Sequence, residues 1–131
     1  MIDRKHDIAD RGKIGEKYVC DYLIKNQCKI AAVNYSSRYG EIDIIAENKT
    51  WIIFVEVKTR TQGSMVGGFE SITRSKIQKI TKTAAYYLMA HPTSKQRRID
   101  CAQVIVNSDN ELVRIDYIKN AVLQTGGIGA I

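Results

Sequence analysis

The chain has 131 residues, 44% of them hydrophobic, and its 20 Lys and Arg against 14 Asp and Glu give a net charge of +6, which favours an anionic partner such as nucleic acid. Three widely separated cysteines and two isolated histidines argue against a zinc site, a redox pair or a histidine-based catalytic pair. No apolar run reaches the roughly 18 residues that cross a bilayer and the N-terminus lacks a signal-like apolar segment, so we expect no membrane contact and a reduced, cytoplasmic protein.

The first element predicted is a helix from about Asp10 to Gln27, where apolar residues recur at helical spacing. Gly12 and Gly15 weaken its first turns by about 1 kcal/mol each relative to Ala, which a chain tolerates more readily where another backbone must approach closely. Glu16 lies beside the apolar stripe. The pattern leaves two interpretations open for Glu16: a boundary residue in a surface ion pair, or an acid with a function.

Three strands are predicted next, over Cys28–Tyr35, Ile42–Ala46 and Trp51–Val57. The second and third form an antiparallel hairpin around a tight turn at Asn48-Lys49, so the numbers of facing residues sum to about 97. Because side chains alternate between the faces of a strand, this register makes Asp43 and Glu56 diagonal neighbours. It places four charged residues on one face, which are Glu41, Asp43, Glu56 and Lys58.

Such acids commonly lie on a solvated face, but both faces of this hairpin also carry β-branched or aromatic residues, which is typical of a strand inside a sheet. Carboxylates that face such an interior repel each other and resist desolvation. They persist only with hydrogen bonds, a lysine or a bound cation to offset that cost. We therefore predict a cation site at Asp43 and Glu56.

The stretch 59–70 contains three glycines and no steady periodicity, so we expect a loop beside the acidic cluster that contacts substrate. A second helix is predicted from Ser71 or Thr73 to Ala90. The first half of this helix is basic.

Four side chains give the second helix its basic face, namely Arg74, Lys76, Lys79 and Lys82. They predict either a track for a phosphate backbone or a solvated helix face, and the pattern does not decide between the two. Tyr86 and Tyr87 are expected to be packing residues rather than platforms on which bases stack.

Two more strands are predicted over Arg98–Val106 and Leu112–Ile118. The uncharged, glycine-containing tail, residues 121–131, is expected to be either mobile or packed on a partner subunit, which leaves a homodimer open. Residues 1–120 contain no linker or internal repeat and predict a single domain. The order of helix, three strands, helix and two strands predicts a mixed α/β sheet with helices on its faces.

Several short motifs together resemble the YraN family of small bacterial proteins. They are Gly15-Glu16, Asn34-Tyr35, Gly40-Glu41-Ile42-Asp43, Val55-Glu56-Val57-Lys58 with Thr59-Arg60, Lys76, Tyr87-Leu88 and Arg98-Ile99-Asp100. Through this family, residues 10–106 are similar to the PD-(D/E)xK nuclease superfamily, and most to its archaeal Holliday-junction resolvase branch. The resemblance implies a three-layer α/β/α restriction-endonuclease-like fold with a mixed central sheet.

The resemblance also implies catalytic roles for four residues. Asp43, Glu56 and Glu16 become ligands of Mg²⁺ or Mn²⁺, and Lys58 becomes the lysine beside the attacking water. The residues expected to bind nucleic acid are Arg60, Arg74, Lys76, Lys79 and Lys82. The implied activity is a metal-dependent endonuclease that acts on DNA, in particular branched or damaged DNA. Three alternatives stay open: a non-catalytic nucleic-acid-binding module, an RNA nuclease of the same fold, and a subunit that contacts a repair or recombination protein.

Overall fold

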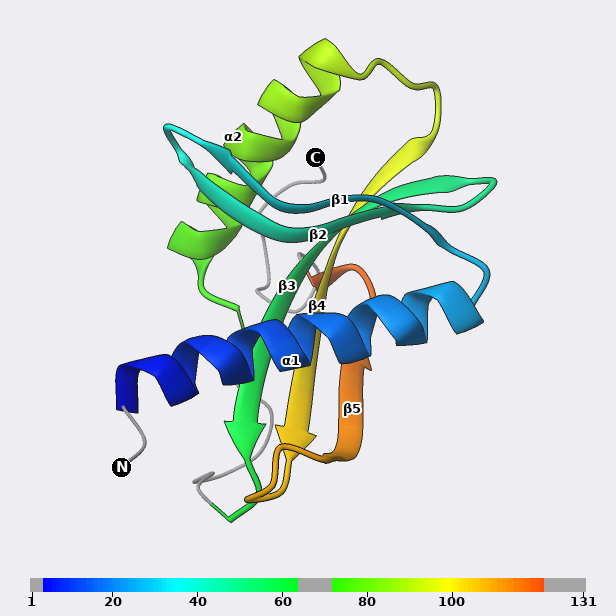
Figure 1. Cartoon of the computed structure of the whole chain (residues 1–131). Helices are drawn as coiled ribbons and strands as arrows, with labels where there is room; N and C mark the ends of the chain where they lie inside the picture. The colour runs from blue at the N-terminus through cyan, green and yellow to red at the C-terminus, as the bar shows by residue number, and fades with distance from the viewer. Residues whose placement is uncertain (1–3, 64–71, 122–131) are drawn as a thin grey trace.

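The computed structural model describes residues 4–63 and 72–121 (Figure 1). Its elements in chain order are α1 (Arg4–Lys25), β1 (Lys29–Ser37), β2 (Gly40–Glu47), β3 (Trp51–Thr61), α2 (Arg74–Ala90), β4 (Gln96–Val106) and β5 (Leu112–Ile118). The strands form one sheet in the order β1-β2-β3-β4-β5, in which β3 and β4 are parallel and the other neighbours are antiparallel. The predicted α/β class with a mixed sheet is therefore confirmed.

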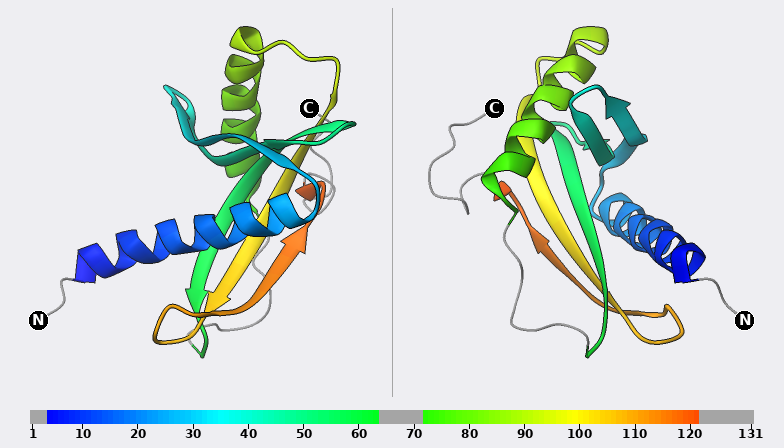
Figure 2. Two further views of the ribbon diagram at one scale, coloured as in Figure 1. Left: turned by 45° about the vertical axis from the view of Figure 1, so that its right-hand side comes forward. Right: turned by 90° about the vertical axis from the view of Figure 1, so that its left-hand side faces the viewer.

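The two helices cover opposite faces of the sheet, which gives three layers, an arrangement consistent with a restriction-endonuclease-like fold (Figure 2). On one face, Val19 and Leu23 of α1 pack against Val55. On the other face, Ile77 of α2 packs in one cluster with Phe54. Because both faces are covered, the middle of β3 is a continuous apolar run rather than an alternating one. No helix in the described ranges is long and apolar enough to span a membrane.

Two elements extend beyond their predicted limits. The helix α1 begins earlier, at Arg4. The strand β3 continues to Thr61, where the predicted loop should already have begun, because the parallel pairing with β4 holds the strand until Thr61 faces Val106. Residues 64–70 of that predicted loop and the tail residues 122–131 lie outside the described residues.

The register of the β2–β3 hairpin is also different. Ile44 faces Val55, so the predicted register is wrong by two residues. The cause is Asn48, whose side-chain oxygen accepts hydrogen bonds from the backbone N–H groups of Thr50 at 2.9 Å and Trp51 at 2.8 Å. This local capping moves the centre of the turn toward Thr50. Since side chains alternate with a period of two, a shift of two residues conserves the face on which each side chain lies.

The helix α1 crosses β3 at Gly15, where its backbone comes close to Thr59. A Cβ atom added to Gly15 would overlap the Thr59 hydroxyl and lie 3.1 Å from the Thr59 Cβ, whereas nothing lies within 4 Å of a Cβ added to Gly12. The close approach expected from these glycines is thus found at Gly15 but not at Gly12. It sets Glu16, the next residue, beside β3.

Replacing Gly15 with Ala should therefore lower the free energy of unfolding by about 1–3 kcal/mol, because the added methyl group must push the helix away from the strand. Gly12→Ala is the matched control: it replaces a glycine of the same helix without a clash and should stabilise the protein by up to about 1 kcal/mol. Urea unfolding followed by circular dichroism measures both changes. Equal effects of the two variants would contradict the close approach at Gly15.

Candidate active site

The pairing of β2 with β3 runs from Glu47–Ile52 to Ile44–Val55, and beyond Ile44–Val55 the two strands separate. From there β2 stays with β1 and turns toward α2, away from the line of β3 (Figure 1). The backbone N–H of Val57 has no partner strand at this point, and Asp43 Oδ2 accepts its hydrogen bond at 2.8 Å. The backbone of the sheet therefore holds the Asp43 carboxylate in place.

Glu56 precedes Val57 in β3, and only 10% of its side chain is exposed. Its Oε1 atom lies 3.4 Å from Lys76 Nζ of α2. Its Oε2 atom is buried and receives no hydrogen bond from the described residues. A buried acceptor without a donor costs about 1–3 kcal/mol, and more when it is charged. A bound cation would satisfy this oxygen.

The carboxylates of Asp43 and Glu56 act on each other in a buried site. Burial, and next the charge of Asp43, raises the pKa of Glu56 to about 7 against the opposing effect of nearby lysines. Burial also raises the pKa of Asp43, while the hydrogen bond from Val57 lowers it. A cation between the two carboxylates would relieve both the desolvation and the mutual repulsion.

Glu16 belongs to α1, which covers one face of the sheet. Glu56 points toward the other face, where it meets Lys76 of α2. Glu16 Oε2 accepts a hydrogen bond from Asn34 Nδ2 at 3.2 Å. Burial and then the charge of Asp43 raise the pKa of Glu16. Within the two described ranges, no three His, Cys, Asp or Glu side chains gather closely enough to hold a metal ion. The structure thus brings Asp43 and Glu56 together and places Glu16 beside Asp43, outside that pair.

The basic residues predicted for the site lie in two places. Lys58 and Arg60 follow Glu56 along β3 at every second residue, so the three share one face of the strand. Three others occupy exposed positions on α2, namely Arg74, Lys79 and Lys82. Lys76 differs from these because it pairs with Glu56, so it belongs to the acidic site and not to a purely solvated helix face.

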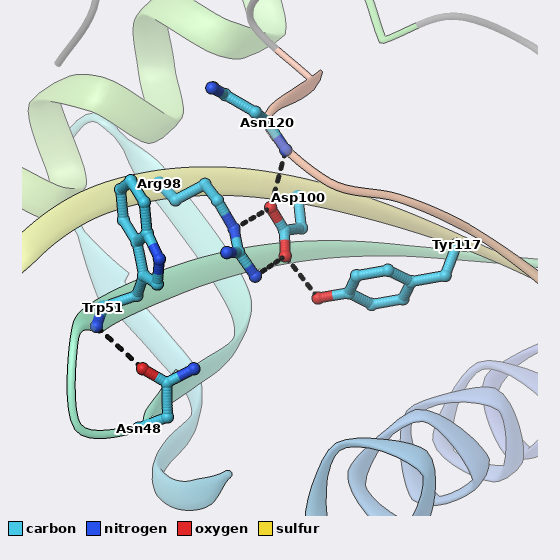
Figure 3. A network of polar contacts seen from close by, with 6 residues as sticks. All are labelled: Asn48, Trp51, Arg98, Asp100, Tyr117 and Asn120. Carbon is cyan, nitrogen blue, oxygen red and sulfur yellow. Dashed lines mark hydrogen bonds and ion pairs between the residues drawn. The ribbon is translucent and has the colours of Figure 1, made fainter. Parts of the chain in front are cut away.

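A second buried acid, Asp100 in β4, has a different environment (Figure 3). Arg98 donates hydrogen bonds to its two carboxylate oxygens at 2.8 and 3.0 Å. The Tyr117 hydroxyl donates another at 2.6 Å, and the Asn120 N–H a further one at 2.8 Å. The Asp100 side chain is 0% exposed and both of its oxygens have donors. Asp100 therefore links β4 to the end of β5 and has a structural role.

Two residues contact the acidic site although the sequence patterns did not predict these contacts. Asn34, which holds Glu16, has a φ of 52°, a left-handed conformation that is uncommon within a strand. Lys76 is the other, because the pattern placed it only on a phosphate track. Each contact joins residues about twenty positions apart, which local periodicity cannot reveal. The one signal for both is that they belong to the motifs that carry the family resemblance.

Comparison with known proteins finds a matching family and similar proteins from several bacteria. The profile described as "Uncharacterised protein family UPF0102" matches residues 15–118. A UPF0102 protein of Persephonella marina is 41% identical over 114 residues, which cover 85% of this chain and 91% of the relative. One from Clostridium botulinum is 40% identical over 115 residues, covering 86% and 93%. One from Fusobacterium nucleatum is 38% identical over 114 residues, covering 84% and 91%.

Proposed function

The chain belongs to the UPF0102 family, which is the YraN family that its motifs predicted, and from its acidic site we propose that it is a metal-dependent endonuclease that hydrolyses phosphodiester bonds of DNA. The observation that carries this proposal is the buried pair of Asp43 and Glu56. Their pKa values are raised by burial, and Glu56 Oε2 has no donor among the described residues. The cofactor would be Mg²⁺ or Mn²⁺.

The residues present fit such an ion. Carboxylate oxygens are the ligands that Mg²⁺ and Mn²⁺ prefer, and Mg²⁺ is usually bound through one or two carboxylates with waters and substrate phosphates as its other ligands. Asp43 and Glu56 supply two such groups. We assign Glu16 to the same site as the acid that adds negative charge beside Asp43.

A bound divalent ion supplies two things here: it lowers the pKa of a water and neutralises charge that develops on the phosphate. Groups of the chain itself position the carboxylates and the water. Val57 N–H and Lys76 hold the two carboxylates in place. Lys58 shares a face with Glu56, and its ammonium group is the candidate to orient the water or stabilise the charged transition state. Burial strengthens each of these interactions because the site is less polar than water.

The proposed contacts with the phosphate backbone lie on the two elements that also carry the site. They are Arg60 on β3 and Arg74, Lys76, Lys79 and Lys82 on α2. The net charge of +6 supports an anionic substrate. The same geometry would serve RNA, and the same fold without turnover would serve as a binding module, so the test must separate these alternatives.

A cleavage screen tests the proposal. Purified protein with Mg²⁺ or Mn²⁺ is offered single-stranded, duplex, flapped and four-way DNA and the matching RNAs, beside Asp43→Asn and the exposed control Asp116→Asn. We expect the wild type and Asp116→Asn to cut at least one DNA. Asp43→Asn should cut at least about a hundredfold more slowly, since it loses a charged ligand, and EDTA should stop the reaction.

Each other outcome rejects the proposal or replaces it. Cutting that survives Asp43→Asn would come from a contaminant. Cutting of RNA alone would support the RNA nuclease. Binding of DNA without cutting in either metal would support the non-catalytic module.

A further inference from the structure

A shallow groove lies between the β1–β2 turn and the outer face of α2. Its volume is about 330 Å³, and its lining residues are Tyr39, Lys82, Ala85, Tyr86 and Met89. Tyr86 is 53% exposed and Met89 81% exposed, so they do not serve the core. The prediction that Tyr87 is a packing residue is confirmed, because it is buried in the core cluster beneath α2, but the same prediction for Tyr86 is wrong.

The β1–β2 turn contacts α2, and the two elements form the walls of the groove. Ser37 Oγ lies 3.0 Å from Thr83 Oγ1 of the helix and also accepts a hydrogen bond from the Tyr39 backbone N–H at 3.0 Å. Gly40 follows with a φ of +149°, and a Cβ atom there would lie 3.6 Å from the Cβ of Lys79. The Tyr39 ring is therefore held against the helix by contacts on both sides of it in the sequence.

Two cations lie over the Tyr39 ring of the groove. Arg38 lies with its guanidinium carbon 4.9 Å from the centre of the Tyr39 ring and donates to the Tyr39 hydroxyl at 2.8 Å. Lys82 Nζ lies 5.6 Å from the same ring centre. An exposed aromatic ring such as Tyr86, close to Arg and Lys side chains, suits unpaired nucleotides, because a base stacks on the ring while the cations contact the phosphates. An apolar protein partner would bury these cations without an opposite charge, which is unfavourable.

We propose that this groove is a platform on which unpaired nucleotides of the substrate stack, with the exposed Tyr86 as the stacking ring and with Lys82 and Arg38, which lie over Tyr39, as the phosphate contacts. This inference rests on the proposed action on nucleic acid and adds a substrate class: strands with a single-stranded segment next to the cut, such as flaps or frayed ends.

The helix sets the distance between platform and acidic site. From Lys76, which pairs with Glu56, to Tyr86 is about 15 Å along α2 at 1.5 Å per residue. Stacked DNA advances about 3.4 Å per nucleotide on one strand, so the platform lies about four nucleotides from the candidate scissile phosphate. Lys79 and Lys82 lie between the two on the same helix.

Binding in EDTA tests the platform without cleavage. Fluorescence anisotropy of a labelled single strand and of the corresponding blunt duplex is measured for the wild type, Tyr86→Ala, Tyr86→Phe and Leu112→Ala. Tyr86→Ala should weaken single-strand binding about tenfold and lower the preference for single strands, while Tyr86→Phe should retain both because its ring still stacks. Leu112→Ala, which shortens an exposed apolar side chain on β5 at the other edge of the sheet, is the control.

Three results would overturn the platform. One is equal loss, or no loss, of single-strand and duplex binding in Tyr86→Ala. Another is a lower sedimentation coefficient of Tyr86→Ala with unchanged binding, which would make the groove an interface between two copies. A third is the absence of binding to either DNA. If the protein cleaves DNA but Tyr86→Ala binds as the wild type does, the nuclease proposal stands and the platform is rejected. If Tyr86→Ala shows the expected loss of single-strand binding but the wild type cleaves nothing, only the nuclease proposal is rejected.

Discussion

Glu56→Gln should reduce cleavage by at least about a thousandfold and at the same time make the metal-free protein more stable at pH 8. The loss of activity is expected because the variant gives up a charged ligand worth several kcal/mol in the transition state. The gain in stability is expected because Glu56 is buried beside Asp43 and its Oε2 has no donor in the described part of the chain. One substitution thus separates function from stability.

The pH dependence of that gain follows from the pKa of Glu56, which burial and the charge of Asp43 raise from 4.5 to about 7. The native state therefore holds this proton more tightly than the unfolded state, and stability falls as the pH rises between about 4.5 and 7. Above pH 7 the penalty is complete, at up to about 3 kcal/mol given 1.36 kcal/mol per pKa unit. Glu56→Gln should remove it at pH 8 and change little near pH 4.

Urea unfolding at the two pH values measures this effect, with Glu47→Gln as the control. Glu47 forms an outer ion pair with Lys95 at 3.6 Å, and the loss of such a pair should change stability by less than about 1 kcal/mol. Mg²⁺ should stabilise the wild type more than Glu56→Gln, because only the wild type offers both carboxylates. A Glu56→Gln protein that is less stable than the wild type at pH 8 would contradict the account of an unsatisfied buried charge.

The acidic pair could be predicted from sequence even though its register could not. The capping of the turn by Asn48 shifts the hairpin by two residues, and a shift of two conserves the face of every side chain. Asp43 and Glu56 therefore remain neighbours. A shift of one residue would have separated them onto opposite faces and removed the site.

Other features of the site depend on contacts that local sequence does not encode. Where β2 separates from β3, the β1–β2 turn contacts α2 instead, and Ser37 Oγ lies 3.0 Å from Thr83 Oγ1. The pairing of Lys76 with Glu56 depends on where α2 lies across the sheet. Periodicity can give a helix its buried face, but it cannot say which strand the helix crosses or which of its polar residues meets an acid there.

Sequence alone is also unable to distinguish two copies of the tripeptide Arg-Ile-Asp, which the structure separates completely. In β4, Arg98 and Asp100 form a buried ion pair whose acid has further donors in Tyr117 and Asn120. In β5, Arg114 and Asp116 form the same pair at 3.2 Å, but their side chains are 55% and 39% exposed.

Asp100→Ala should therefore lower the free energy of unfolding by about 3–5 kcal/mol, because it leaves the Arg98 charge buried without its partner. Asp116→Ala removes the same residue from the same tripeptide and should cost less than about 1 kcal/mol, since water replaces the lost contact. Urea unfolding of both variants makes the comparison. Where Asp100→Ala still folds, its stabilisation by Mg²⁺ should match the wild type, since Asp100 has no open oxygen for a cation. Similar losses from the two variants, or loss of the Mg²⁺ effect in Asp100→Ala alone, would contradict the assignment of Asp100 as a structural acid distinct from Asp43 and Glu56.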